Sequence, residues 1–588
     1  MLKALFRWLD ATPGFYWACA IGSLILFVSV LVRLFLVVQV QTAGKRGPVD
    51  AVFWAGVAVV LSAWRWPFLL AAGHFNPDES QLIAGAITLK RDWVFWRSVD
   101  GATAGPLDFF ALWPLHFLGV PLDFFGARLT ALVLIWGTIV ACYQTLKVFY
   151  KPEVAALACL PMLVIYAFVT QGDFLHYSTE TLPIFLVAWA WYFILSAKAD
   201  RRQENQVSVK WFWAGLCLGC LPWAKLQGAP IAAAVFVFAL FLIFRQGRSN
   251  WNQSSKNGLR ASLGIVTPSV FWIGMICSFG LWSDFYTSYI EHNLFYQETG
   301  SSFPEVMHGF LGYLGGDPTV PFFFCVSISI IVGLLLGKRT LRDHLPSVML
   351  GGAILWMVVC CYVVLAPHRG FPHYLVFLFV PMGLLCGLAF AAWAARVGEV
   401  TPRRVIHFFP LLGIILIGVV PALIFRLRQP SPFMIGLLAR DWANPRNEVS
   451  QVIVRYRQPG DTLGMWGWFP QVYVETNLAQ ATRDAHSQTS IDASPFGRYY
   501  QKRYLKDLAS ARPAVFVDAV GRNAFAYTDR DSYGHEMFPA LDDFVKANYR
   551  LVKDCSLARV YVRVDRFMEK ENNYGSSSSG PKSSGGIR

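Results

Sequence analysis

Two adjacent carboxylates, Asp78 and Glu79, follow Pro77 at the end of an apolar stretch of membrane length. A carboxylate in this place is suited to act as a general base, which removes a proton from a reacting hydroxyl. Asp78, directly after Pro77, is also suited to cap a helix that begins near Glu79, because acidic side chains stabilise the positive end of a helix. The residue types and their spacing leave both interpretations open.

The composition of the chain indicates whether these residues belong to a soluble or a membrane protein. Of its 588 residues, 55% are hydrophobic and only 15% are charged, whereas a soluble protein averages about 25% charged residues. These values exclude a soluble globular enzyme, a disordered chain and a small disulfide scaffold, and they indicate a polytopic membrane protein. The net charge of +14 is concentrated in loops between apolar segments, which argues against a nucleic-acid partner.

Eleven apolar segments have roughly the 20 residues that cross about 30 Å of hydrocarbon. They are residues 51–72, 129–146, 154–170, 182–197, 211–224, 229–244, 263–281, 320–336, 348–365, 374–395 and 408–425. Residues 15–40 are a further candidate within an extra N-terminal hydrophobic segment, residues 1–50. The sequence thus predicts an α-helical polytopic membrane protein with about 11–12 spans, in which residues 51–426 form the transmembrane domain.

The orientation of the spans follows from the distribution of Lys and Arg. One alternate set of loops holds sixteen of these residues, and the opposite set holds six. Because cytoplasmic loops carry the excess of positive charge, the first set is predicted to be cytoplasmic. The large loops 73–128 and 282–318, and everything after residue 425, are then outside. Within the first of these loops, residues 79–91 and 107–118 are predicted to form helices that lie on the outer surface.

The C-terminal part of the chain is predicted to be a small exported α/β domain over residues 427–566. Helix patterns at 448–457, 499–511 and 540–548 alternate with strand patterns at 462–466, 514–517 and 560–564. This part holds one cysteine, Cys555, so it forms no internal disulfide. Residues 567–588 are predicted to be a disordered tail because they are mostly small and polar.

Several short motifs occur in a recognisable order on the predicted outer face. They are residues 74–80 (HFNPDES), 105–110 (GPLDFF), 125–129 (FGARL), 223–228 (WAKLQG), 370–374 (GFPHY) and 465–473 (MWGWFPQVY). Taken together, the chain resembles the GT-C membrane glycosyltransferases. The greatest likeness is to the dolichyl-phosphate-mannose-protein mannosyltransferase-like family and its relatives, the lipid A aminoarabinose transferases. The resemblance covers nearly the whole chain, and the extra N-terminal segment departs from the pattern.

The resemblance implies a donor sugar linked to a polyprenyl phosphate and an acceptor that loses a hydroxyl proton. It implies that Asp78 is the general base and that Glu79 positions Asp78 or the acceptor. One carboxylate that activates the attacking hydroxyl in a single displacement predicts inversion at the anomeric carbon. Asp173, at the outer end of another span, is either a second acidic site residue or the cap of a loop.

A departing lipid phosphate needs positive charge nearby, and Lys225 and Arg369 are rare cations on the outer face past the first loop. Phosphate contact is one interpretation for both. The alternatives are a lysine that reaches the lipid headgroups and an arginine in a plain surface loop. His373, beside Tyr374 in the GFPHY motif, is predicted either to donate to the same phosphate or to be a satisfied buried histidine.

A divalent cation remains an option rather than a requirement, because two or three cationic donors can hold one lipid phosphate. Possible ligands lie on the predicted outer face, but none of them shows the spacing of a metal site. These residues are His176, Glu291, His292, Glu305 and His308. We therefore predict no specific metal ligands.

The sequence predicts a multi-pass glycosyltransferase of the bacterial inner membrane with a periplasmic C-terminal domain. Its partners are a polyprenyl-phosphate-linked sugar donor, a lipid, glycan or protein acceptor, and membrane lipids. The alternatives are a transporter or flippase for a lipid-linked saccharide, and a noncatalytic GT-C-like binding subunit. Transporters place ionisable residues near the middle of the membrane and often contain inverted repeats, whereas the charged candidates here gather at one face.

Overall fold

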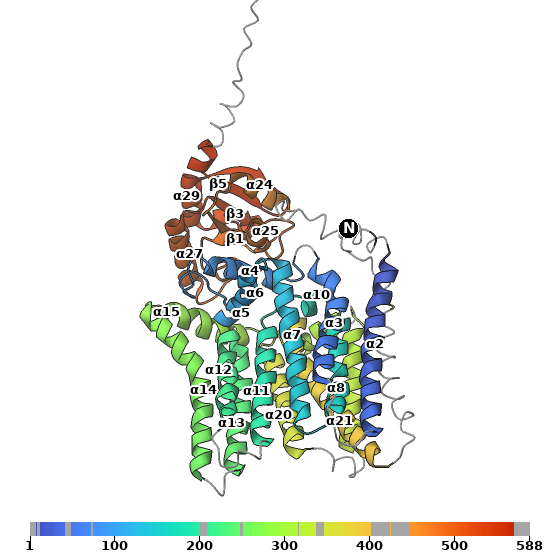
Figure 1. The fold of residues 1–588 in the computed structure, drawn as a ribbon. Helices are drawn as coiled ribbons and strands as arrows, with labels where there is room; N and C mark the ends of the chain where they lie inside the picture. Colours follow the sequence, from blue (N-terminus) through green and yellow to red (C-terminus); the bar gives the residue numbers. More distant parts are fainter. Residues whose placement is uncertain are drawn as a thin grey trace, which may run out of the picture. The chain divides into compact units, whose positions relative to one another are not determined.

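The computed structural model describes most of the chain as two compact units (Figure 1). The described residues are 12–40, 49–71, 74–199, 208–246, 251–314, 317–336, 346–400 and 447–569, with Trp8 and Ile424. The helical unit comprises Met1–Asn76, Thr103–Trp282 and Tyr289–Ala439, and the α/β unit comprises Pro77–Ala102, Ser283–Ser288 and Arg440–Arg588. The α/β unit thus takes segments from both of the large loops in addition to the C-terminal part.

Within the described residues, eight helices of the helical unit are long and apolar enough to cross a membrane. They are α2 (Pro13–Val40), α3 (Val49–Leu69), α7 (Phe124–Lys147), α11 (Thr181–Ala199), α13 (Ala229–Gln246) with the turn η2 (Leu226–Gly228) before it, α14 (Trp251–Ser278), α20 (Ser347–Leu365) and α21 (Val376–Val400). The prediction of an α-helical multi-pass membrane protein is confirmed.

Three other predicted spans also form helices. They are α12 (Lys210–Ala224), α18 (Thr319–Leu336) and the pair α8 (Pro152–Ala158) and α9 (Leu160–Phe168). The pair was predicted as one continuous span, but Pro161 lies in the first turn of α9 and cannot supply the backbone N–H that a continuous helix needs. The predicted span 408–425 lies outside the described residues, apart from Ile424.

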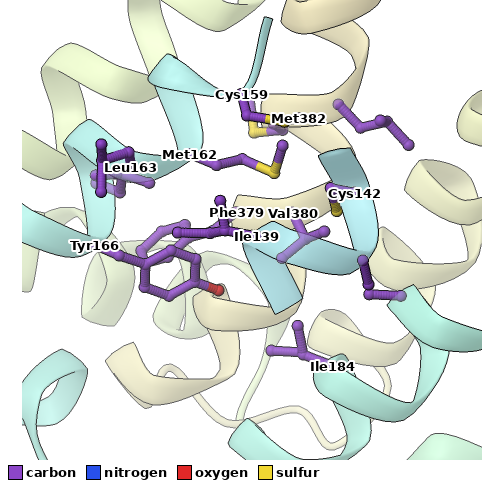
Figure 2. Close-up of a cluster of buried hydrophobic side chains, with 14 of the residues drawn as sticks. Ile139, Cys142, Cys159, Met162, Leu163, Tyr166, Ile184, Phe379, Val380 and Met382 are labelled. Atoms are coloured by element: carbon purple, nitrogen blue, oxygen red, sulfur yellow. The ribbon is translucent and has the colours of Figure 1, made fainter. Parts of the chain in front are cut away.

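The core of the helical unit lies where α9 packs against α21 (Figure 2). The ring centroids of Tyr166 and Phe379 are 5.9 Å apart. A Cβ atom on Gly383 would lie 2.3 Å from Cγ of Met162, so a larger residue at this position would require the Met162 side chain to move. The helix α2, from the extra N-terminal segment, packs along α3 and α8.

The short helix α12 is clamped against α14 by glycines. A Cβ atom on Gly215 would lie 2.1 Å from the carbonyl oxygen of Ala261, and one on Gly219 would lie 2.2 Å from that of Ile265. Small residues four positions apart let two membrane helices approach with their backbones nearly in contact. This packing holds α12 and therefore the position of Lys225, which directly follows it.

Several short elements connect the long helices of this unit. They are α5 (Pro106–Phe110), α6 (Trp113–Phe117), α10 (Gly172–Leu175), α16 (His292–Glu298), α17 (Phe303–Leu314) and the 3-10 turn η5 (Pro372–Leu375). Figure 1 shows α5, α6 and α10 near one end of the long helices. The helix predicted over 107–118 is thus two short helices, the second of which has Pro114 in its first turn. The helices α15 (Trp282–Phe285) and η4 (Tyr286–Glu291), a π-helical turn, include the residues where the chain passes between the units.

The α/β unit is built on a five-stranded sheet with the strand order β2-β1-β3-β5-β4. The strands are β1 (Thr462–Gly467), β2 (Ala479–Gln480), β3 (Val515–Ala519), β4 (Tyr549–Asp554) and β5 (Arg559–Arg563). β1 pairs in parallel with β2 and β3, while β5 pairs antiparallel with β3 and β4. In the central register, Met465 lies opposite Val517, which lies opposite Val560, and all three are fully buried.

Helices cover this sheet and confirm the expectation of a small α/β fold. They are α4 (Pro77–Leu89), α24 (Glu448–Tyr456), α25 (Gln471–Thr476), α26 (Gln488–Ile491), α27 (Gly497–Ala511), α28 (Arg530–Tyr533), the 3-10 turn η7 (His535–Met537) and α29 (Pro539–Asn548). The helix α4, predicted over 79–91, comes from the first large loop and packs against α25 and β2.

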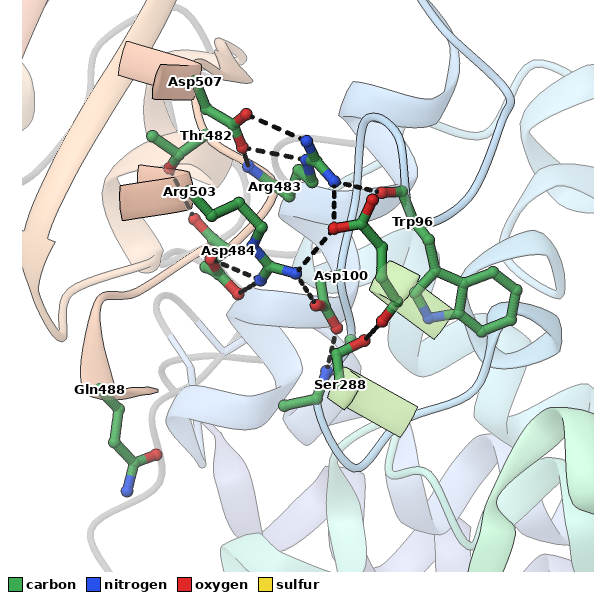
Figure 3. Close-up of polar contacts among 12 residues, drawn as sticks. Trp96, Asp100, Ser288, Thr482, Arg483, Asp484, Gln488, Arg503 and Asp507 are labelled. Carbon is green, nitrogen blue, oxygen red and sulfur yellow. Dashed lines mark hydrogen bonds and ion pairs between the residues drawn. The ribbon is translucent and has the colours of Figure 1, made fainter. Parts of the chain in front are cut away.

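A buried charge cluster holds the loop segments in the α/β unit (Figure 3). Arg503 on α27 contacts Asp484 at 2.8 Å and Asp100 at 2.8 Å. Arg483 contacts Asp284 at 2.7 Å and Asp507 at 3.1 Å. Two arginines thus join acids from three separate parts of the chain, and this cluster explains why 77–102 and 283–288 fold with the C-terminal part.

Candidate functional site

Lys225 lies in an irregular turn where α12 gives way to η2. Pro222 stands in the last turn of α12, and Lys225 itself has an extended backbone. The segment before α5 lies directly on this turn, because the Gly105 N–H donates to the Ala224 carbonyl oxygen at 2.6 Å and Ala104 forms a β-bridge with Lys225. The residues of the 105–110 and 223–228 motifs are therefore neighbours in space.

Glu180 is the buried counter-ion of Lys225. The Lys225 ammonium donates to Glu180 and also to Thr179 Oγ1, the latter at 2.8 Å. The Glu180 side chain is fully buried, and 6% of the Lys225 side chain is exposed. Burial alone would raise the pKa of Glu180, but the charges of Lys225 and His373 hold it down, at about 2. Glu180 is therefore a carboxylate, and the sequence prediction missed it.

An aromatic wall completes the surroundings of Lys225. The ammonium lies 4.8 Å from the ring centroid of Tyr374, a cation–π distance. His373 and Tyr374 lie in η5, are both buried, and pack edge to face with 4.7 Å between ring centroids. The predicted residues Lys225, His373 and Tyr374 are thus brought together by the structure.

A cavity of about 200 Å³ opens beside this cluster within the helical unit. Lys225, Tyr374 and Tyr296 line it, together with the amides Gln227, Asn293 and Gln297. The rest of its wall is mostly apolar and includes Leu226, Pro230, Val363 and Pro367. A cavity with one buried ammonium, a few amides and apolar walls is suited to a ligand that has an anionic head and a hydrocarbon chain.

Arg369 lies next to this cavity without appearing in its wall. Its guanidinium lies 4.6 Å from the ring centroid of Tyr296, which does line the cavity, and its Nη2 donates to Thr299 Oγ1 at 3.4 Å. Arg369 is partly exposed and follows His368, which has a positive φ of 52°. The arginine therefore belongs to the rim of the Lys225 cavity.

Asp173 lies in a different pocket of the helical unit. It is in α10, where its Oδ1 accepts a hydrogen bond from Asn76 Nδ2 at 2.7 Å. Together with His176 it lines a pocket that does not include Lys225. The next residue, Phe174, is fixed because its carbonyl oxygen accepts from Arg65 Nη2 at 2.6 Å. The structure therefore does not bring Asp173 into the wall of the Lys225 cavity.

Asp78 and Glu79 occupy the first turn of α4 in the α/β unit. Asp78 is partly exposed and Glu79 is fully buried. One turn along the same helix, Gln81 Oε1 lies 3.3 Å from His486 Nε2, and His486 stacks on Trp468 with 4.2 Å between ring centroids. The position of Asp78 in the first turn is compatible with both the cap and the base, so its role stays a prediction.

Among the described residues, one set of side chains has the spacing of a metal site, Asp518, His535 and Glu536 in the α/β unit. An arginine already satisfies these groups, since Arg530 Nη2 lies 2.7 Å from Asp518 Oδ2 and 2.6 Å from Glu536 Oε1. The positive charge of a metal ion would have to displace this guanidinium. The cluster is therefore explained as a structural ion-pair network.

No family model and no curated protein matches the chain. Solved structures match its fold, and they include two of ArnT. ArnT from Cupriavidus metallidurans bound to undecaprenyl phosphate has a TM-score of 0.54 at 13% sequence identity, and the match covers 87% of this chain and 98% of that chain. The same protein in the apo state has a TM-score of 0.53 at 14% identity, with coverage of 90% and 100%. This chain therefore has the fold of ArnT, a lipid A aminoarabinose transferase, and the predicted resemblance is confirmed at the level of the fold.

Proposed function

We propose that this protein is a membrane glycosyltransferase that uses a polyprenyl-phosphate-linked sugar as its donor. One observation carries the proposal: the buried ammonium of Lys225 lines a largely apolar cavity in a chain that shares its fold with an ArnT structure bound to undecaprenyl phosphate. An ammonium and an apolar wall match the two chemical parts of a polyprenyl phosphate, its anionic head and its hydrocarbon chain.

In this proposal Lys225 and Arg369 stabilise the phosphate, which gains negative charge as the sugar leaves. His373 donates a further hydrogen bond, and Tyr374 fixes the direction of the ammonium through its ring. The cation–π contact is supported by a distance of 4.8 Å. These groups can act without a metal ion, since each supplies positive charge or a donor.

The chemical step requires a base as well as a phosphate site. We assign the base to Asp78, with Glu79 in a positioning role, and Asp173 is a second acidic candidate. A hydroxyl of a lipid, glycan or protein loses its proton to Asp78 and attacks the anomeric carbon from the face opposite the phosphate. The carbon–oxygen bond to the phosphate breaks, so the configuration is inverted and polyprenyl phosphate is released.

We place the protein in the bacterial inner membrane with its C-terminal domain in the periplasm. The distribution of Lys and Arg among the loops supports this orientation. In a variant without its native cysteines, single cysteines introduced at the exposed positions 303 and 371 should be labelled only from outside, and those at positions 201 and 202 only from the cytoplasm. Position 371 labelled from the cytoplasm alone would contradict the orientation.

The function is tested with the purified full-length chain in lipid nanodiscs. It should bind undecaprenyl phosphate, and it should release undecaprenyl phosphate from a panel of undecaprenyl-phosphate-linked pentoses and hexoses when a mixed acceptor extract is added. A new glycosidic bond, detected by mass spectrometry, separates an enzyme from a flippase or a binding subunit. Binding without transfer across the panel would favour the noncatalytic alternative.

A further inference from the structure

The Asp108 carboxyl group is buried in an unusual way. The residue lies in α5 with no exposed surface, and neither of its two side-chain oxygens has a hydrogen-bond partner among the described residues. Burying a polar group without a partner costs free energy, so most buried polar groups in folded proteins are paired. Asp108 is therefore a group whose retention calls for an explanation other than stability.

The backbone places Asp108 beside Lys225. One helical turn before it, the Gly105 N–H binds the Ala224 carbonyl oxygen at 2.6 Å, and a Cβ atom on Gly105 would lie 2.2 Å from the carbonyl oxygen of Trp223. From the other side, the Tyr177 hydroxyl donates to the backbone carbonyl oxygen of Asp108 at 2.7 Å. The segment that carries Asp108 is thus fixed against the turn that carries Lys225.

The surroundings of Asp108 disfavour its ionised form. Lys225 is already neutralised by Glu180 in a direct ion pair. Burial raises the pKa of Asp108 well above its usual range; Lys225 lowers it, and Glu180 raises it further. The phenols of Tyr177 and Tyr289, which also face Asp108, are neutral because burial raises their pKa as well. Burial, the lack of a hydrogen-bond partner and the nearby Glu180 therefore all favour the neutral carboxylic acid, which carries an O–H group.

We propose that Asp108 is a specificity residue of the lipid-phosphate site, a neutral acid whose O–H donates to a phosphate oxygen when the phosphate engages Lys225. This inference rests on the proposed function. An ionised carboxylate at this place would repel the phosphate, whereas a neutral acid supplies a donor without adding a second cation. The same logic applies wherever an apolar site keeps a carboxylic acid neutral so that it can donate.

The role of Asp108 requires no proton transfer. Its O–H stays bonded to the carboxyl group, and the hydrogen bond strengthens as the phosphate goes from a singly charged diester to a doubly charged monoester. A donor aimed at the place where charge develops lowers the barrier more than it strengthens substrate binding. Asp108 would therefore aid both the binding of undecaprenyl phosphate and the departure of the phosphate.

The test uses two replacements of the same size class in the full-length chain in nanodiscs, with undecaprenyl phosphate as the probe. Asp108→Leu removes an unpaired buried polar group, so it should raise the thermal unfolding midpoint. It should also weaken undecaprenyl phosphate binding by about 10- to 100-fold, the loss expected for one hydrogen bond to a charged group. Asp108→Asn keeps a neutral donor and should recover most of the lost affinity.

A matched buried acid serves as the control for stability. Asp317 is also fully buried, but its carboxylate accepts hydrogen bonds from Thr170 and Gln171 and from the Thr319 N–H at 2.8 Å. Asp317→Asn should therefore lower the unfolding midpoint, because an amide N–H₂ would face these donors. The opposite signs for Asp108→Leu and Asp317→Asn would separate an unpaired acid from a paired one.

Three results would overturn the inference. Wild-type affinity in Asp108→Leu, together with weakened binding when Lys225 and Glu180 are both replaced by Gln, would remove Asp108 from the site and leave the proposed function intact. Wild-type affinity in Asp108→Leu and also in the Lys225→Gln/Glu180→Gln double variant would contradict the proposed phosphate site itself. An Asp108→Asn variant that binds as weakly as Asp108→Leu would show that a neutral donor at this position does not restore binding, which would contradict the inference.

Discussion

At the scale of single residues, Lys225 and Glu180 cannot be tested one at a time, because each neutralises the other inside the protein. Removing one member of a buried ion pair leaves an uncompensated charge and costs about 3–5 kcal/mol. A single replacement would therefore confuse the loss of a ligand contact with the loss of the fold. Arg369 is partly exposed and carries no such complication.

We expect Lys225→Gln to lower the thermal unfolding midpoint strongly and the double variant Lys225→Gln/Glu180→Gln to restore most of it. The double variant still lacks the ammonium, so its affinity for undecaprenyl phosphate should fall by about tenfold or more. Titration of equally folded variants in nanodiscs measures this. If the double variant, with its stability restored, binds undecaprenyl phosphate as tightly as the wild type, Lys225 pairs only with Glu180 and does not contact the ligand.

The ion pair also predicts a dependence of stability on pH. Burial would raise the pKa of Glu180, but Lys225 and His373 lower it from an ordinary value of 4.5 to about 2. Because the pKa is lower in the folded state, the pair stabilises the fold fully above about pH 4.5 and progressively less toward about pH 2. The wild-type unfolding midpoint should drop across this range more than that of the double variant. Equal acid sensitivity of the two proteins would argue against a salt-bridged Glu180.

The sequence predicted Lys225 as a site residue but gave no sign of its partner Glu180. Lys225 was found because an isolated cation between two apolar segments is unusual. Glu180 lies 45 positions earlier, next to Thr179 in an ordinary polar turn, and no local pattern joins it to a lysine on another helix. Asp108 belongs to the GPLDFF motif, but the sequence does not show that its carboxyl group is buried without a partner, because that depends on how the helices pack.

At the scale of elements, hydropathy predicted most of the long helices, because crossing a membrane imposes length and apolarity together. It could not predict that the loop segments 77–102 and 283–288 fold with the C-terminal part. Their membership depends on long-range contacts such as the β-bridge between Asp100 and Asp484. Pairing of this kind leaves no periodic signal in either segment.

The charge cluster of the α/β unit predicts how these segments are held. Arg503→Met should leave Asp100 and Asp484 without their shared cation and destabilise the α/β unit by about 3–5 kcal/mol. Hydrogen exchange should rise first in residues 96–102 and 283–288, which this cluster attaches. Lys502→Met, an exposed neighbour on α27, is the matched control. Unchanged exchange in both loop segments would mean that apolar packing alone retains them.

At the scale of the whole molecule, the candidate residues are divided between the two units. Lys225, Arg369, His373 and Tyr374 belong to the helical unit, and Asp78 belongs to the α/β unit. The proposed reaction needs both a phosphate site and a base, so the two functions can be separated by experiment. Loss of the base should leave phosphate binding intact, whereas loss of the phosphate site should remove both binding and transfer.

Asp78→Asn tests the base because its two interpretations predict opposite results. A positioned base contributes about 10²- to 10⁴-fold to the rate, so transfer should fall by that factor while undecaprenyl phosphate still binds and the unfolding midpoint stays close to that of the wild type. If Asp78 is only a helix cap, asparagine replaces it well and transfer should survive. Asp123 provides the matched control, since its Oδ1 caps α7 by accepting from the Gly126 N–H at 2.9 Å. Asp123→Asn should retain transfer. A loss of transfer in Asp78→Asn alone would then assign a chemical role to the Asp78 carboxylate. Equal activity of the two variants would show that Asp78 acts only as a helix cap.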